Sequence, residues 1–402
     1  MKRLNLNSIL VVGNGSVATN EYGFYRYFVD NRVYYHRQAL VIVADETPTV
    51  CCGSLTHLKA LNERGFWDVR MVGDRLAEGL VDILGSRGIT NGRIGYCPET
   101  LPASWFDCIH SAYPELEWVD CTMDLYEIRK KRSREECRLV EKCAELALSG
   151  YEALCAAVQN NVTESKLVSE LDYAMKKQGA EETLTTLNCG FLNDANGMGL
   201  LHSAANSQKA VKYGDCIAAA ITPRYNGYWV QMLRTLCVGK ENQTAVAMHE
   251  AVAGWISAAA KLLIPGNKVS TVAQKIEEEA RAAGYTIGGI QGYICGVDLR
   301  EQPISAENET KLTKDMTVIL SPIILKDGAD RAGAGASGEE EVSHEELYGR
   351  SEGRRHRANS PALPRRADRN AGGAFRRKEV QRPAEPQGAE NLQAGFAGAG
   401  GL

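Results

Sequence analysis

The sequence has no apolar run of the roughly 18 residues that a membrane-spanning helix requires. It also has no excess of one charge, because 46 Lys and Arg oppose 50 Asp and Glu, for a formal net charge of −4. A strongly basic surface for nucleic acid is therefore not expected. The short apolar run after Lys2 and Arg3 predicts a first strand rather than a signal peptide. We expect a cytoplasmic protein without a membrane or nucleic-acid partner.

Paired cysteine spacing is absent as well. The chain has 12 cysteines, but none of them forms the C-x-x-C pattern of a zinc or thioredoxin-like site. They are scattered through apolar stretches such as LCVG and YICG, where a reduced cysteine acts as a small hydrophobic side chain. The glycine-rich segment GNGSVATNEYG lacks both the third glycine of a dinucleotide fingerprint and the G-K-[ST] ending of a phosphate loop. No cofactor is predicted from these patterns.

Strand and helix signals alternate over residues 1–125. The segments SILVVG, ALVIVAD, VRMVG and RIGYC are short apolar runs that predict buried strands. The segment DRLAEGLVDILGSRG has apolar residues three and four apart and ends at Gly88, which predicts a helix. Alternation of this kind is typical of an α/β layer domain, which we place at residues 1–125.

The pattern changes over residues 126–328. Ser133 and Glu136 form a capping box that predicts the start of a long amphipathic helix. Thr163 and Gly179 flank a second helical segment as cap and stop. Asn226-Gly227 predicts a hairpin turn between two β-branched and aromatic segments. Two further helices follow over 241–263 and 269–284, and MTVILSPIIL ends a hairpin-like stretch.

Residues 329–402 have a third composition. They are rich in Gly, Ala, Arg and Pro and have almost no large apolar side chains. Such a segment buries too little surface to offset the entropy of ordering, so we predict disorder. A shift of reading frame near residue 328 is the alternative, because Glu codons such as those of Glu339 to Glu341 read as Lys or Arg codons when displaced by one base.

Five segments follow one another along the C-terminal part: IRKKRSREECRLVEKCAELA, VTESKLVSELDYAMKKQGA, YNGYWVQMLRTLCVGK, GYICGVDLREQP and MTVILSPIIL. In this order they resemble the creatinase and Xaa-Pro aminopeptidase superfamily. The resemblance implies an α/β (α+β) protein with a creatinase-like N-terminal domain and a C-terminal pita-bread domain at 126–328. In that fold two α/β halves pack around a central site, and homodimers are common, so a homodimer is expected.

The resemblance also implies where metal ligands would lie. Family members hold two divalent ions with two Asp, one His and two Glu, and the ions generate the hydroxide that attacks the peptide carbonyl. The matching positions here are Ala220, Gln231, Tyr293 and Ser321, and the fifth falls beyond residue 328. A methyl, a neutral amide, a phenol and a hydroxyl cannot balance the charge of two divalent ions. We therefore expect no dinuclear metal site.

Other positions match non-ligand residues of the family. His202 falls where relatives have a substrate-facing histidine, which serves as the acid/base in metal-free creatinase, and its ordinary pKa suits proton transfer. Arg234 matches the arginine of the family's "RT" pair, and Arg300 replaces a second histidine beside Glu301. We expect the two arginines and Glu301 to contact substrate and Arg300 to hold an anionic group. Tyr228, Trp229 and Tyr293 are expected to line the pocket.

Each of these assignments has a structural alternative. His202 would then be a hydrogen-bonded structural histidine, and Arg234 would pair with a buried carboxylate. Arg300 would form an outward salt bridge with Glu301, and the aromatic residues would pack in the core.

Three functions remain open for a small-molecule or short-peptide substrate. The first is a metal-independent hydrolase of a small C–N compound, an amide, amidine or cyclic one, with His202 as acid/base. The second is a non-catalytic pseudoenzyme that binds a peptide or small ligand. The third is an Xaa-Pro aminopeptidase or dipeptidase, which the missing ligands oppose.

Overall fold

The computed structural model describes residues 1–13, 23–33, 37–65, 67–190, 201–326 and 336–337. All described residues belong to one compact unit. The predicted tail at 329–402 lies outside the described residues, apart from 336–337, and its disorder and the frame shift stay predictions. Among the described helices, none combines the length and the apolarity needed to cross a membrane.

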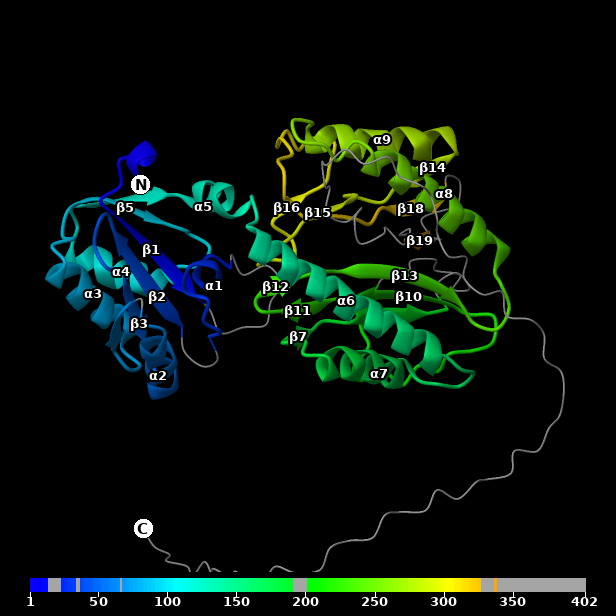
Figure 1. Cartoon of the computed structure of the whole chain (residues 1–402), viewed down its shortest axis with the longest axis horizontal. Coiled ribbons are helices and arrows are strands. Elements are labelled where there is room, and N and C mark those ends of the chain that lie inside the picture. The colour runs from blue at the N-terminus through cyan, green and yellow to red at the C-terminus, as the bar shows by residue number, and fades with distance from the viewer. Residues whose placement is uncertain (14–22, 34–36, 66, 191–200, 327–335, 338–402) are drawn as a thin grey trace, which may run out of the picture. The chain divides into compact units, whose positions relative to one another are not determined.

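The N-terminal part is built on one mixed sheet with the strand order β4-β3-β2-β1-β5-β6 (Figure 1). Neighbours β1–β2 and β2–β3 are antiparallel, whereas β1–β5, β5–β6 and β3–β4 are parallel. The strands are β1 Ser8–Gly13, β2 Gln38–Val43, β3 Thr49–Cys52, β4 Asp68–Met71, β5 Gly92–Tyr96 and β6 Leu116–Asp120. The helices are α1 Phe24–Val29, α2 Leu55–Arg64, α3 Leu76–Ser86 and α4 Ala103–Ala112.

Strand β1 is buried on both faces, which explains its continuous apolar sequence. Ile9 and Val11 pack into one hydrophobic cluster, and Leu10 and Val12 pack into another. Successive strand residues point to opposite faces, so each cluster covers one side of the sheet. The strands and the helix expected from SILVVG, ALVIVAD, VRMVG, RIGYC and DRLAEGLVDILGSRG are present. The burial expected for VRMVG is wrong, because β4 is the edge strand of the sheet and its residues are partly or fully exposed.

Helices α6 (Arg134–Ala157) and α7 (Glu164–Lys177) cover one face of the four-stranded sheet of the C-terminal part. Helix α5 (Thr122–Arg129) leads to α6, where the predicted capping box between Ser133 and Glu136 is present in both directions. Helix α7 is capped by Thr163, as expected. The sheet has the order β13-β10-β8-β9, from strands β8 Thr186–Cys189, β9 His202–Ser203, β10 Cys216–Ile221 and β13 Met232–Cys237. Helix α6 lies against β10 and β13, and α7 lies beside α6 and against β8 (Figure 1).

The predicted Asn226-Gly227 turn is confirmed. Both residues have positive φ, 46° and 89°, which is the backbone of a tight hairpin turn. The turn joins β11 (Pro223–Tyr225) to β12 (Tyr228–Trp229), and β11 also pairs with β7 (Glu182–Thr183).

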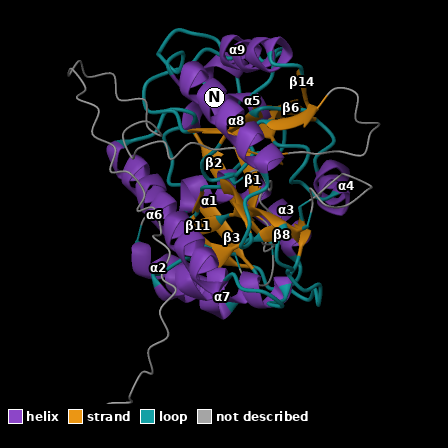
Figure 2. Cartoon of the chain, turned by 90° about the vertical axis from the view of Figure 1, so that its right-hand side faces the viewer, coloured by secondary structure: helices purple, strands orange, loops and turns teal. Residues whose placement is uncertain are grey.

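The remaining helices and strands form the second half of this part. Helices α8 (Gln243–Ala260) and α9 (Val269–Ala282) pack together, as both views show (Figures 1 and 2). The strands are β14 Tyr285–Ile287, β15 Gly292–Ile294, β16 Gln302–Pro303, β17 Val318–Leu320, β18 Ile323–Lys326 and β19 Ala336–Ser337. The hairpin-like stretch expected to end in MTVILSPIIL is present as two antiparallel pairs, because β17 pairs with β15 and β18 pairs with β14.

Candidate functional site

The positions that match the first two metal ligands lie on one face of the large sheet. Ala220 is buried in β10, and Gln231 directly precedes β13 and donates from Nε2 to Thr222 Oγ1 at 3.1 Å. Ala219 and Met232 pack into the cluster formed with α6 and α7. Because strand residues alternate between faces, Ala220 and Gln231 point away from those helices.

The other two positions lie in the small sheet of order β16-β15-β17. Tyr293 is the central residue of β15 and is paired with Ile319. Ser321 is buried just after β17, and its backbone N–H donates to Gln291 O at 2.8 Å. The Arg300 guanidinium lies 4.7 Å from the centre of the Tyr293 ring. Tyr293 and the exposed Arg300 therefore form a cation–π pair.

The two aromatic residues of β12 are packing residues. Tyr228 donates from its hydroxyl to Glu136 Oε1 at 2.7 Å, and burial together with this bond raises the pKa of the phenol well above its ordinary value. Trp229 is 1% exposed and packs with Cys295, Leu299 and Ile319. The structure thus places both rings in the core, the alternative that the sequence left open.

His202 has a carboxylate partner that sequence reasoning missed. Its Nε2 lies 3.4 Å from Oε2 of Glu164, the first residue of α7, and the histidine side chain is 45% exposed whereas Glu164 is fully buried. Glu164 also accepts hydrogen bonds from the Cys189 backbone N–H at 2.8 Å and the Ser207 hydroxyl at 2.6 Å. These donors hold the carboxylate in place, so it can orient the imidazole.

The imidazole points to the helix side of the sheet. The register of the ladder places Arg234, Ala219, Leu187 and His202 in one row across β13, β10, β8 and β9. Residues directly opposite each other share a face, and Ala219 and Leu187 pack against α6 and α7. His202 is therefore on the face opposite to Ala220, on the strand that ends the sheet order of the described residues.

Arg234 lies in the same row. Its guanidinium is 5.5 Å from the ring centre of Tyr151 in α6. Its Nη1 donates a hydrogen bond to the backbone carbonyl oxygen of the preceding residue, Leu233, at 2.8 Å. The structure thus brings His202 and Arg234 onto one face, separated by three strand spacings, roughly 14 Å. It places neither on the face of Ala220 and Gln231.

Glu301 belongs to a buried charge network, which corrects its expected role as a substrate contact. Its two carboxylate oxygens face Arg129 Nε at 3.3 Å and Arg132 Nη2 at 3.0 Å. Arg129 also pairs with Asp298. Burial alone would lower the pKa of the Arg129 guanidinium, but the charges of Asp298 and Glu301 outweigh it and hold that pKa above its ordinary value. Both carboxylate oxygens of Glu301 thus pair with buried arginines. The outward salt bridge with Arg300, which the sequence left open as an alternative, is not the one that Glu301 forms.

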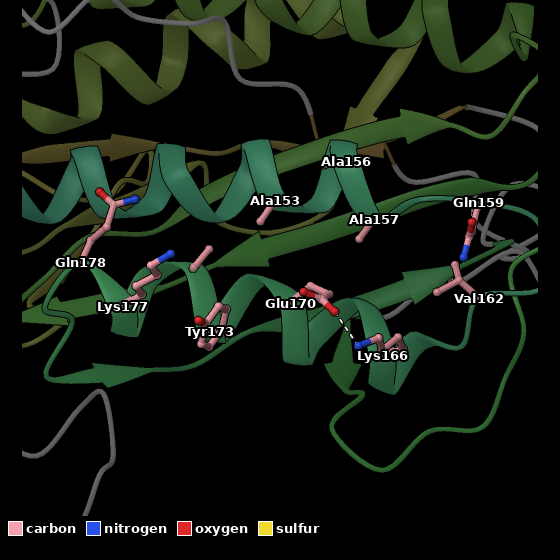
Figure 3. Close-up of a pocket in the computed structure, with 11 residues that line it drawn as sticks. Ala153, Ala156, Ala157, Gln159, Val162, Lys166, Glu170, Tyr173, Lys177 and Gln178 are labelled. Atoms are coloured by element: carbon pink, nitrogen blue, oxygen red, sulfur yellow. Dashed lines mark ion pairs between the residues drawn. The ribbon is translucent and has the colours of Figure 1, made fainter. Parts of the chain in front are cut away.

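A separate groove runs along the outer helices. It lies between α6 and α7 and is lined by small apolar residues such as Ala153 and Ala157, with Tyr173 and the Lys166–Glu170 ion pair of 2.5 Å at its edge (Figure 3). Its lining contains neither His202 nor any of the four ligand positions.

The donor atoms at the four ligand positions do not fit two divalent ions. They are a methyl group, a neutral amide, a phenol and a hydroxyl, without a single carboxylate or imidazole. Within the described part of the chain, no three His, Cys, Asp or Glu side chains gather closely enough to hold a metal ion. The fifth position falls after residue 328, outside the described residues.

Solved structures share this architecture. The X-Pro aminopeptidase of Thermotoga maritima aligns with a TM-score of 0.69 and 19% identity over 84% of this chain and 95% of its own. The prolidase of Pyrococcus horikoshii aligns with a TM-score of 0.68 and 20% identity over 81% and 88%. At these identities the likeness establishes the fold, which is the pita-bread fold with a smaller N-terminal α/β domain.

Sequence relatives lead to the family. The Xaa-Pro dipeptidase of Pyrococcus furiosus is 26% identical over 200 residues, which are 49% of this chain and 56% of that protein, so the chain spans about half of its length. The creatinase of a Bacillus species is 24% identical over 332 residues, 76% of each chain. The profile of metallopeptidase family M24 matches residues 138–346, more than half of the chain. The chain belongs to metallopeptidase family M24.

Proposed function

We propose that this chain is an M24 protein that works without the family's two-metal centre and binds a short peptide or small amide-like molecule. The donor set at Ala220, Gln231, Tyr293 and Ser321 carries this proposal. Two divalent ions bring four positive charges, and their sites need anionic ligands to offset the loss of hydration. Neutral side chains at four of the five positions supply no such charge.

The placement of the remaining polar residues favours binding over hydrolysis. His202 and Arg234 lie on the helix side of the sheet, and Glu301 is held by Arg129 and Arg132. What stays beside the ligand positions is the cation–π pair of Arg300 and Tyr293. An exposed guanidinium over an aromatic ring is suited to anchoring a carboxylate, such as the C-terminus of a dipeptide.

The first test is elemental analysis of the purified protein. We expect far less than one Mn, Co or Zn ion per chain, and no hydrolysis of Xaa-Pro dipeptides with or without added Mn²⁺ or Co²⁺. A family member that keeps the five ligands serves as the positive control. Two ions per chain, together with peptidase activity abolished by a chelator, would overturn the proposal.

A metal-independent hydrolase is the second candidate, and the His202–Glu164 pair favours it. A half-exposed imidazole beside a fixed, buried carboxylate is suited to general acid–base chemistry. Such an enzyme would act on a small amide, amidine or cyclic C–N compound with water as the nucleophile, and creatinase is among the relatives.

Substitution of His202 separates the two candidates. If the imidazole transfers the proton, His202→Ala lowers the turnover of amide, guanidino or cyclic substrates by about 10²-fold or more. The binding proposal predicts no turnover in either protein and unchanged dipeptide binding by calorimetry. His110→Ala is the matched control, because His110 stacks on Phe106 in the N-terminal part.

A further inference from the structure

Two cysteines face each other across the ladder between β10 and β13. Cys216 is the first residue of β10 and Cys237 is the last residue of β13, and they are directly paired in the antiparallel register. Their Sγ atoms are 3.6 Å apart. Directly opposed residues of an antiparallel pair have Cα atoms about 4.5–5.5 Å apart, which lies within the range of about 4.4–6.8 Å found in disulfides. A covalent bond therefore requires side-chain rotation and little movement of the backbone.

The two thiols differ in access. Cys216 is buried, whereas Cys237 is partly exposed. Burial, followed by the contact with Cys237, raises the pKa of the Cys216 thiol to about 12. Cys237 is consequently the thiol that meets a dissolved oxidant first, and Cys216 lies in position to react with the product.

The two cysteines that are neighbours in sequence, in the N-terminal sheet, do not form a comparable pair. Cys51 and Cys52 are neighbours in β3, but they pack into different hydrophobic clusters on opposite faces of the sheet. Both are fully buried. The Cys216–Cys237 pair thus combines what those two lack: a shared face and a route to solvent.

We propose that Cys216 and Cys237 form a peroxide-sensitive dithiol that closes to a disulfide in the folded protein. The Cys237 thiol loses its proton and the thiolate attacks one oxygen of hydrogen peroxide. The O–O bond breaks, a sulfenic acid forms, and the leaving hydroxide takes up that proton as water. The Cys216 sulfur then attacks the sulfenic sulfur, the S–S bond forms, and a second water leaves with the Cys216 proton. Two thiols are oxidised by two electrons, and one peroxide is reduced to two waters.

The bond would join the strands that carry two of the four ligand positions. Cys216 and Cys237 lie on the same sheet face as Ala220 and Gln231, and they pack with Ala245 in the first turn of α8. Oxidation would therefore fasten the end of β13 where the chain leaves for α8. This inference is independent of whether the protein hydrolyses or only binds its ligand.

Peptide mapping of the full-length protein tests the proposal. The native protein is treated with hydrogen peroxide, alkylated, digested without reductant and analysed by mass spectrometry. We expect a cross-linked peptide pair containing Cys216 and Cys237 that dithiothreitol separates. In Cys216→Ser, Cys237 is expected to accumulate as a sulfenic acid that dimedone captures.

Cys155→Ser is the control, because Cys155 is exposed on α6 and is not part of the pair. It should leave the cross-link unchanged. The proposal fails if peroxide oxidises Cys155 in the native wild-type protein while Cys216 and Cys237 both remain open to alkylation. It also fails if the cross-link forms only after a denaturant is added. Both results are measured on the wild-type protein, so they do not require that any variant folds.

Discussion

Arg129→Ala is expected to lower the free energy of unfolding by about 3–5 kcal/mol, because it leaves the buried carboxylate of Asp298 without its ion-pair partner and that of Glu301 with Arg132 alone. The Arg129 side chain is fully buried, and its guanidinium lies 4.4 Å and 4.5 Å from the ring centres of Phe24 and Tyr126. It pairs with both Asp298 and Glu301. Urea denaturation followed by tryptophan fluorescence measures the loss as a lower midpoint.

An exposed ion pair provides the matched control. Arg93 pairs with Glu117 at 2.6 Å, but these side chains are 35% and 60% exposed. Arg93→Ala should cost less than about 1 kcal/mol, as surface ion pairs do. Equal losses for the two variants would mean that Asp298 and Glu301 are not desolvated in the folded protein, contrary to the burial described above.

The network has a second role, because Asp298 and Arg129 also contact residues of the N-terminal part. Asp298 also accepts a hydrogen bond at 2.7 Å from the backbone N–H of Gly23, which precedes α1. Arg129 ends α5, and Phe24 begins α1. The loop around Asp298 is thus fixed against the N-terminal part, which positions the neighbouring Arg300 and Tyr293.

Gly292→Ala is the second substitution with a large expected effect, about 3 kcal/mol or more. Gly292 has φ of +143°, which side chains rarely adopt, and an added Cβ would lie 1.9 Å from the carbonyl oxygen of Ile319. That carbonyl belongs to β17, which pairs with β15 through Gly292 and Leu320. The backbone must therefore move, and the Tyr293 position moves with it.

A glycine in open space is the control for this prediction. Gly254 lies on the exposed side of α8, and an added Cβ there meets no atom within 4 Å. Gly254→Ala should raise the free energy of unfolding by about 0.5–1 kcal/mol, since alanine loses less conformational freedom in a helix. Thermal unfolding of both variants should shift in opposite directions. A Gly292→Ala protein as stable as wild type would show that this crowding is absent in solution.

Local signals in the sequence predicted the local structure well. The capping box at Ser133, the cap at Thr163 and the Asn226-Gly227 turn each depend on contacts within a few residues, so the pattern alone predicts them. Strands β3 and β6 were missed, because a run of four or five residues is too short to show a clear period.

The candidate site was predicted less completely, because it depends on register. Whether Arg234 faces α6 or the ligand positions is decided by which residue of β10 lies opposite, and a shift of one residue would reverse the answer. Glu164 contacts His202 across 38 positions of sequence, and nothing in either segment indicates the other. The buried partners of Glu301 were hidden for the same reason, since Arg129 and Arg132 precede it by more than 160 residues.

The two faces of β10 can change independently of each other. Residues 217, 219 and 221 attach the sheet to α6 and α7, and residues 216, 218 and 220 have no part in that attachment. An acidic side chain can therefore disappear from the second set without loosening the first. Metal ligands on this face can therefore be replaced during evolution while the packing of the sheet against α6 and α7 is kept.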